Sequence, residues 1–288
     1  MTASEPLPEL KKLFPFQSRY FETGRYKVHY VDEGTGPVLL LMHACPMWSF
    51  AFRDLIWKFR KNHRVVAMDQ MGFGLSDKPL EFDYRLENHT AILESFIRHL
   101  DLRDITFIMH GRGSTIGMAY AVRNPENVKA FVSLNAMAFS DFRLPLRLQI
   151  CRLKWLGAKI VMGVDLFTRE TKHMPPAVRD CYDLPLRSTE SKNSLLRFIE
   201  DIPTVPEDES ARSMLEIESS LWMLRAKPSA IIWAGEDWLY TSKCYEKWMH
   251  YFPEAEHYTL DHAGRYLSED APMELASILT EFLRRHKC

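Results

Sequence analysis

The sequence has few cysteines, almost no net charge and no long apolar run. Its five cysteines form no C-x-x-C pair, so reduced thiols fit better than a disulfide framework or a zinc site; they are Cys45, Cys151, Cys181, Cys244 and Cys288. The formal net charge of −1 argues against a general nucleic-acid surface. The first 20 residues lack an uninterrupted apolar core, and no run of about 18 apolar residues is free of charge. We therefore expect a cytoplasmic protein without a signal peptide, a membrane span or a nucleic-acid partner.

Internal repeats and low-complexity segments are also missing from the sequence. What remains is an ordinary globular composition, with 46% hydrophobic and 26% charged residues in 288 positions. This length and composition favour one domain with an insertion, or at most two small domains.

Short apolar runs alternate with amphipathic segments along the first 140 residues. The runs have the length and turn boundaries of strands and lie at 26–34, 37–43, 63–69, 105–110 and 128–137. Segments 84–102 and 114–125 carry apolar residues at helical spacing. This alternation predicts an α/β protein with a mostly parallel sheet and crossover helices.

The pattern becomes helical from about residue 139 and returns to strands near SAIIWAGED, which begins at position 229. We therefore expect a discontinuous core formed by residues 1–138 and 227–288, with a helical cap at 139–226. A helical insertion of this kind usually covers the ends of the strands, which makes it a candidate lid over a pocket.

Five segments occur in an order that is characteristic of one fold: HACPMWSFAFRDLI, DQMGFGLSDKP, HGRGS, IIWAGEDW and DHAGRYLSEDAP. In this order the chain resembles the α/β-hydrolase fold, and within it the haloalkane dehalogenases and the β-lactone decarboxylases of olefin biosynthesis. The resemblance covers nearly the whole chain, including VRDCYDLPL and FIEDIP in the cap region. It implies a mostly parallel sheet with helices on both faces and an inserted helical cap.

The resemblance also shows where this chain departs from the family. Family members attack carbon with an aspartate at the nucleophile elbow, activate water with a histidine and orient that histidine with an acid. Here the elbow position is Gly111, the histidine position is Arg265 in AGRY, and the acid is retained as Asp237. Glycine cannot form the covalent ester, and a permanently protonated arginine cannot act as the usual base.

Two positions that bind the anion in the family are also changed. Arg112 follows the elbow, where a tryptophan is common, and Cys45 replaces asparagine because the usual HGNP is HACP here. The backbone N–H groups of Arg112 and Cys45 could still form an oxyanion hole, since that role needs no side chain. His43 and His110 are secondary candidates for a base, although a structural role is favoured for both.

The roles of the substituted residues stay open at this point. Gly111 either relaxes a turn that no longer carries a nucleophile or makes room for a different substrate pose. Arg265 either pairs with Asp237 or, together with Arg112, binds a carboxylate or phosphate.

The cap contains a basic stretch without an acid, FRLPLRLQICRLKWLGAKIVMGV. Its basic residues are Arg143, Arg147, Arg152, Lys154 and Lys159. Such a segment can contact an anionic membrane surface or a protein partner, but a cap helix with its basic residues in water is favoured.

These observations leave three functions. The first is a non-covalent enzyme of lyase, isomerase or cyclase type, acting on a hydrophobic molecule with an anionic or carbonyl group. The second is a catalytically inactive protein that binds a small hydrophobic or acyl-type molecule or a protein partner. The third is a residual hydrolase with an unconventional nucleophile such as Cys45. We identify no cofactor-binding or metal-binding motif.

Overall fold

The protein is built on one eight-stranded sheet with the strand order β1-β2-β4-β3-β5-β6-β7-β8. The computed structural model describes residues 8–141, 144–153, 156–163 and 170–288. The strands are β1 (Arg19–Thr23), β2 (Tyr26–Glu33), β3 (Val38–Met42), β4 (Arg64–Met68), β5 (Ile105–Gly111), β6 (Val128–Ala136), β7 (Ser229–Ala234) and β8 (Glu256–Leu260). Pairing is antiparallel for β1–β2 and β2–β4 and parallel elsewhere. The predicted α/β class with a mostly parallel sheet is confirmed.

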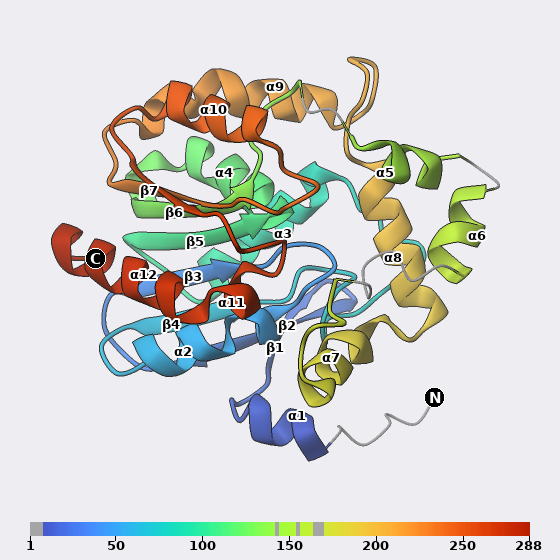
Figure 1. Cartoon of the computed structure of the whole chain (residues 1–288), viewed down its shortest axis with the longest axis horizontal. Helices are drawn as coiled ribbons and strands as arrows, with labels where there is room; N and C mark the ends of the chain where they lie inside the picture. The colour runs from blue at the N-terminus through green and yellow to red at the C-terminus, as the bar shows by residue number, and fades with distance from the viewer. Residues whose placement is uncertain (1–7, 142–143, 154–155, 164–169) are drawn as a thin grey trace.

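Helices cover both faces of the sheet, which explains why its central strands are continuous apolar runs. On one face lie α3 (Leu86–His99), α4 (Arg112–Arg123), α9 (Ala211–Ser220) and α10 (Ser242–Tyr251), and on the other lie α2 (Arg53–Phe59), α11 (Leu267–Asp270) and α12 (Pro272–His286) (Figure 1). All residues of β5 are buried. Its successive side chains alternate between the layers, with Phe107 and Met109 in one core and Ile108 in the other.

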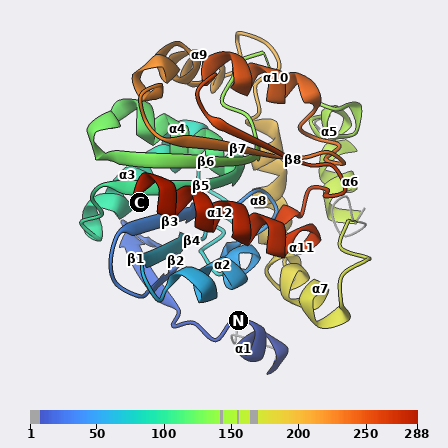
Figure 2. The same cartoon turned by 60° about the vertical axis from the view of Figure 1, so that its left-hand side comes forward.

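In the described part of the chain, five α-helices follow β6 and precede β7, as the change of pattern predicts. They are α5 (Leu146–Cys151), α6 (Leu156–Gly163), α7 (Pro176–Asp183), α8 (Thr189–Glu200) and α9. Helices α5 to α8 lie beyond one end of the sheet (Figures 1 and 2), and we call these four helices the helical insertion. Helix α9 instead packs against α4 and belongs to the layer that covers the sheet.

Two amino-terminal elements were not predicted from the sequence. Strand β1 pairs with β2 through a turn at Gly24, which has a φ of 61°. Helix α1 (Pro8–Leu13) packs against α7 of the helical insertion. Among the described helices, none has the length and apolar character needed to cross a membrane.

Candidate functional site

The site begins where β5 turns sharply into α4. Gly111 ends the strand with φ 56° and ψ −126°, and Arg112 is the first residue of the helix. A positive φ is unfavourable for a residue with a side chain but not for glycine, so this turn keeps the backbone conformation that presents a nucleophile in the family, without the strain. The elbow geometry is therefore preserved although its side chain is absent.

The space beside Gly111 is occupied by the methyl group of Ala44. A Cβ atom added to Gly111 would lie 2.7 Å from the Ala44 Cβ, closer than real Cβ atoms approach, and 3.5 Å from the Tyr240 hydroxyl. Ala44 stands in HACP where the family pattern HGNP has glycine. The two positions are therefore complementary, because a side chain at one of them requires glycine at the other.

Arg112 turns from the elbow toward the helical insertion. Its guanidinium forms a buried ion pair through Nη2 with Asp201, which directly follows α8, and lies over the Phe198 ring at 5.0 Å. Its Nε and Nη1 are buried without a hydrogen-bond partner in the described part of the chain. Asp201 also accepts hydrogen bonds from the Ser210 hydroxyl and, at 3.0 Å, from the Leu86 N–H. Burial raises the pKa of Asp201, and Arg112 opposes this rise.

Arg265 contacts a different part of the cap region. Its Nη2 donates to the carbonyl oxygen of Cys45, and its Nε lies 3.9 Å from Oε2 of Glu170. The other carboxylate oxygen of Glu170 accepts a hydrogen bond from the Trp238 indole. Burial acts to lower the pKa of Arg265, but the charge of Asp237 together with those of Tyr240 and Glu170 outweighs it, so the pKa lies above its ordinary value. The guanidinium stays charged and cannot serve as a base.

Asp237 is held as a structural carboxylate in the loop after β7. It accepts hydrogen bonds from the N–H groups of Leu239 at 2.8 Å and Tyr240 at 3.4 Å and from the Asn135 amide at 3.3 Å. Burial raises its pKa, while Arg265 acts in the opposite direction. Asp237 therefore influences Arg265 by its charge, whereas the ion pair that we observe within 4 Å joins Arg265 to Glu170.

The charges of both arginines act on Cys45, but its thiol is a poor nucleophile. Burial raises the pKa of its thiol to about 12, although Arg265 and Arg112 both act to lower it. The thiol is therefore protonated at neutral pH, and the thiolate that would attack a substrate is not populated.

The two histidines are buried and neutral. His43 bonds the carbonyl of Ala44 at 2.9 Å and accepts the N–H of Gln70 at 2.9 Å, so both ring nitrogens are used in loop structure. Burial, followed by the charge of Arg265, lowers the pKa of His110 to about 3. The Nε2 atom of His110 has no hydrogen-bond partner within the described residues. A structural role suits His43, and the lowered pKa makes His110 a weak base.

The structure thus gathers the predicted site residues around the elbow and adds three that the sequence did not reveal. Asp201 and Glu170 neutralise the two arginines, and Ala44 fills the position next to Gly111. Asp201 lies in FIEDIP, a segment that we identified by resemblance without assigning it a role. Nothing in the sequence around Glu170 distinguishes it from a surface residue.

A surface cleft of about 440 Å³ opens beside Arg265. Its lining includes Glu170, His173, Trp238 and His262. The buried guanidinium therefore borders an opening to solvent, lined by both an aromatic side chain and charged groups.

The basic stretch of the cap is partly held by the protein itself. Arg152 donates to the carbonyl of Ile202 and lies 3.2 Å from Asp208, and Arg147 lies over the Trp238 ring. Arg143 and Lys154 lie outside the described residues. Arg152 and Arg147 are thus engaged within the protein, which weakens the prediction that this stretch contacts a membrane or a partner.

Comparisons with known proteins agree with this architecture. Residues 37–272 match the α/β-hydrolase fold family, so the chain belongs to that family. It is 33% identical to a cis-3-alkyl-4-alkyloxetan-2-one decarboxylase of Shewanella oneidensis, over 95% of this chain and 90% of the relative. It is 31% identical to haloalkane dehalogenase 2 of Mycobacterium tuberculosis, over 94% and 96% of the two chains.

Solved structures show the same fold. A haloalkane dehalogenase of Agrobacterium tumefaciens superposes with a TM-score of 0.84 at 21% identity, covering 94% of this chain and 97% of that one. The resemblance to haloalkane dehalogenases and β-lactone decarboxylases is therefore confirmed at the level of family and fold.

Proposed function

We propose that the elbow site of this protein is non-catalytic and acts as a binding site. The carrying observation is that both substituted arginines lie against carboxylates of the protein, Arg112 against Asp201 and Arg265 against Glu170. The charge of Asp237 also acts on Arg265, and Glu170 is shared with Arg147. Two buried cations without counterions would need an anionic substrate to offset their desolvation. Carboxylates of the protein therefore already offset the charge of both arginines without a substrate.

The molecule bound is proposed to be small and hydrophobic. Relatives are named for alkyl-substituted oxetanones and haloalkanes, and the chain keeps their fold over nearly its whole length. The cleft beside Arg265 offers Trp238 as an apolar contact. A reducing, cytoplasmic setting is part of the same proposal, supported by five buried cysteines that form no disulfide.

Non-covalent catalysis is the second candidate, favoured by what the site retains. The N–H of Arg112 belongs to the first turn of α4, where amides have no partner within the helix and attract negative charge. Asp237 also keeps its hydrogen bonds. The residual hydrolase ranks last because the pKa of the Cys45 thiol is about 12.

The test compares four proteins against β-lactones and haloalkanes, with product followed by mass spectrometry. These are wild type, Arg265→Ala, Gly111→Asp/Arg265→His, and the latter with Ala44→Gly added. We expect no product from wild type, and more product from the triple than from the double variant, because Ala44→Gly makes room for the aspartate. The same compounds should raise the Tm of wild type.

Wild-type turnover that falls in Arg265→Ala would overturn the binding proposal in favour of non-covalent catalysis. If no compound of the panel is turned over and none changes the Tm, the support for a small hydrophobic ligand is removed. Circular dichroism of every variant separates loss of function from loss of fold.

A further inference from the structure

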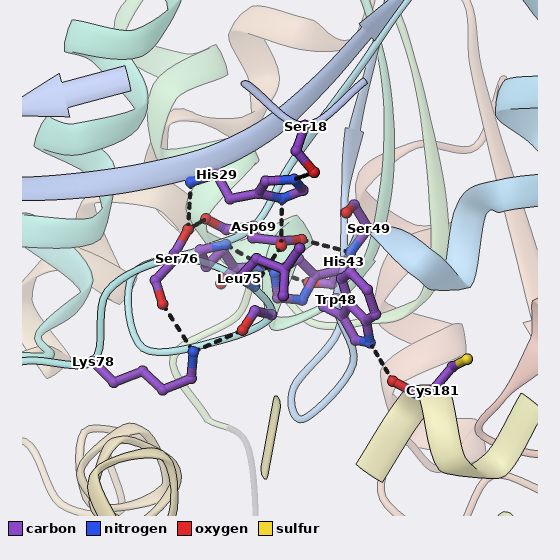
Figure 3. A network of polar contacts seen from close by, with 12 residues as sticks. Ser18, His29, His43, Trp48, Ser49, Asp69, Leu75, Ser76, Lys78 and Cys181 are labelled. Carbon is purple, nitrogen blue, oxygen red and sulfur yellow. Dashed lines mark hydrogen bonds and ion pairs between the residues drawn. The ribbon is translucent and has the colours of Figure 1, made fainter. Parts of the chain in front are cut away.

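A second group of chemically active side chains lies outside the elbow, next to the antiparallel edge of the sheet. Figure 3 shows Ser18, His29 and Asp69 in a line of hydrogen bonds. The Ser18 Oγ lies 3.0 Å from Nε2 of His29, and Nδ1 of the same ring lies 2.8 Å from Oδ2 of Asp69. Both distances are within the range that joins a nucleophile to its base and the base to its orienting acid.

The environment of Asp69 fixes the direction of these hydrogen bonds. The backbone N–H groups of Ser49 and Leu75 both donate to the Asp69 carboxylate, and hydrogen bonds of this kind favour its ionised form. An ionised carboxylate only accepts hydrogen bonds, so Nδ1 of His29 donates. In a neutral ring Nε2 is then an acceptor, and it faces the Ser18 hydroxyl in the state required of a general base.

The acid and the base are rigidly held. Asp69 follows β4 and accepts the N–H of Ser49 at 2.7 Å and the N–H of Leu75 at 2.9 Å. The backbone N–H of His29 donates to Ser76, whose hydroxyl donates to the carbonyl of Asp69. His29 and Asp69 are fully buried, so their geometry is preorganised before any ligand arrives.

The serine, in contrast, is open to solvent. Ser18 is exposed and immediately precedes β1, the edge strand of the sheet. Alternate N–H groups of an edge strand point away from the sheet and are available to stabilise an oxyanion. Tyr20, opposite His29 in the strand register, is about half exposed and packs edge-on against the His29 ring at 5.4 Å, which offers an apolar contact for a small acyl or aryl group.

We propose that Ser18 is an activated nucleophile that accepts acyl groups from small aryl esters, with His29 as general base and Asp69 as the orienting acid. The Ser18 Oγ forms a bond to the ester carbonyl carbon while its proton passes to Nε2 of His29. The bond from the carbonyl carbon to the aryl oxygen then breaks, and the phenol leaves with that proton. Water releases the acid from the acyl-serine by the same proton path. This activity is independent of the elbow and of the function proposed for it.

Full-length protein treated with a fluorophosphonate tests this proposal, because phosphonylation leaves a stable mass on the serine as fluoride departs. We expect intact mass to show one added group, which peptide mapping places on Ser18. We also expect the protein to hydrolyse p-nitrophenyl acetate faster than buffer alone does. Ser18→Ala should not be labelled, and its rate of p-nitrophenyl acetate hydrolysis should fall at least tenfold. Ser219→Ala is the matched control, since this exposed serine bonds only the Glu216 carbonyl within the described residues and should change nothing.

His29→Asn tests the base separately from the fold, because its amide can replace Nδ1 in donating to Asp69 but offers nothing at Nε2. Labelling should slow at least tenfold in this variant while circular dichroism stays unchanged. A wild-type protein without label, or with the label at another serine, would overturn the proposal whatever the variants do. Running the elbow panel also in a Ser18→Ala background assigns any β-lactone turnover to one site or the other.

Discussion

At the residue scale, Gly111 combines a positive φ with a close neighbour. A residue other than glycine at its φ of 56° costs about 1 to 3 kcal/mol. Its Cβ would also lie 2.7 Å from that of Ala44. We therefore expect Gly111→Ala to lower the free energy of unfolding by more than backbone strain alone, and Ala44→Gly to recover part of the loss. Urea unfolding monitored by circular dichroism measures both effects.

Gly24 provides the control for Gly111. It has a φ of 61°, and a Cβ there would meet no atom within 4 Å, so Gly24→Ala reports strain without crowding. The loss in the free energy of unfolding caused by Gly111→Ala/Ala44→Gly should be about as large as that caused by Gly24→Ala. Equal costs for Gly24→Ala and Gly111→Ala would show that the Ala44 methyl group does not matter.

Asp237 predicts a pH dependence whose sign is opposite to that of an ordinary paired carboxylate. Burial raises its folded pKa above the value of about 3.9 expected for an unfolded aspartate. Between those two values the folded protein keeps a proton that the unfolded chain has lost, so this contribution is present at low pH and is lost as pH rises. The free energy of unfolding of wild type minus that of Asp237→Asn should fall between about pH 4 and the raised pKa. Urea titrations from pH 4 to 8 test this.

Asp208 supplies a comparison with the reverse sign. Burial opposes its ionisation, but hydrogen bonds from the N–H groups of Thr204 and Val205 outweigh it and lower the pKa. Its contribution is present above the unfolded pKa and is lost as pH falls. The difference between wild type and Asp208→Asn should therefore rise from the lowered pKa to about pH 4 and stay level from pH 4 to 8, where the Asp237→Asn difference falls. Parallel slopes for Asp237→Asn and Asp208→Asn would contradict both assignments.

At the element scale, the Arg112–Asp201 pair joins the start of α4 to the end of α8. Removing one partner of a buried pair leaves the other charge uncompensated, typically at a cost of about 3 to 5 kcal/mol. We expect Asp201→Ala and Arg112→Met to be strongly destabilising alone and less than additive together. A double-mutant cycle from urea unfolding measures this coupling.

The exposed Arg212–Glu216 pair within α9 is the matched control. Its atoms lie 3.0 Å apart at i and i+4, a geometry worth about 0.3 to 0.5 kcal/mol at the surface. A coupling in the buried pair no larger than in this exposed pair would show that Arg112 and Asp201 do not tie the two helices together.

The strands and the Arg112–Asp201 pair show which features could be predicted from the sequence and which could not. Strands β2 to β7 carry apolar runs between turn residues, so their pattern predicts them well, whereas β8 has only one buried residue, Leu260. β1 was not predicted because an exposed edge strand has no such run. Phe21 is the one residue of this strand that is buried. Arg112 and Asp201 lie 89 positions apart, and only tertiary packing shows that they meet. The sequence identified the substituted positions but not the carboxylates that balance them.

At the scale of the whole molecule, two ion pairs join the cap region to the core, the buried Arg112–Asp201 pair and the partly exposed Arg265–Glu170 pair. Arg112 joins the elbow to Asp201 after α8, and Arg265 joins the loop after β8 to Glu170 before α7. If the elbow site binds without turnover, as proposed above, these ion pairs set how readily the helical insertion opens. The free energy of a local opening depends on the interactions that the opening breaks, so removing both pairs should expose α7 and α8 while the sheet stays intact.

Hydrogen–deuterium exchange of Glu170→Gln/Asp201→Asn against wild type tests this opening. Each isosteric change keeps the shape of the side chain and removes the charge that balances an arginine. We expect exchange in α7 and α8 to become at least tenfold faster, a change of about 1.4 kcal/mol in the opening free energy, with β5 and β6 unchanged. Glu216→Gln should leave every segment at its wild-type rate. Faster exchange throughout the sheet would instead mean that the two pairs stabilise the global fold and not the closed position of the insertion.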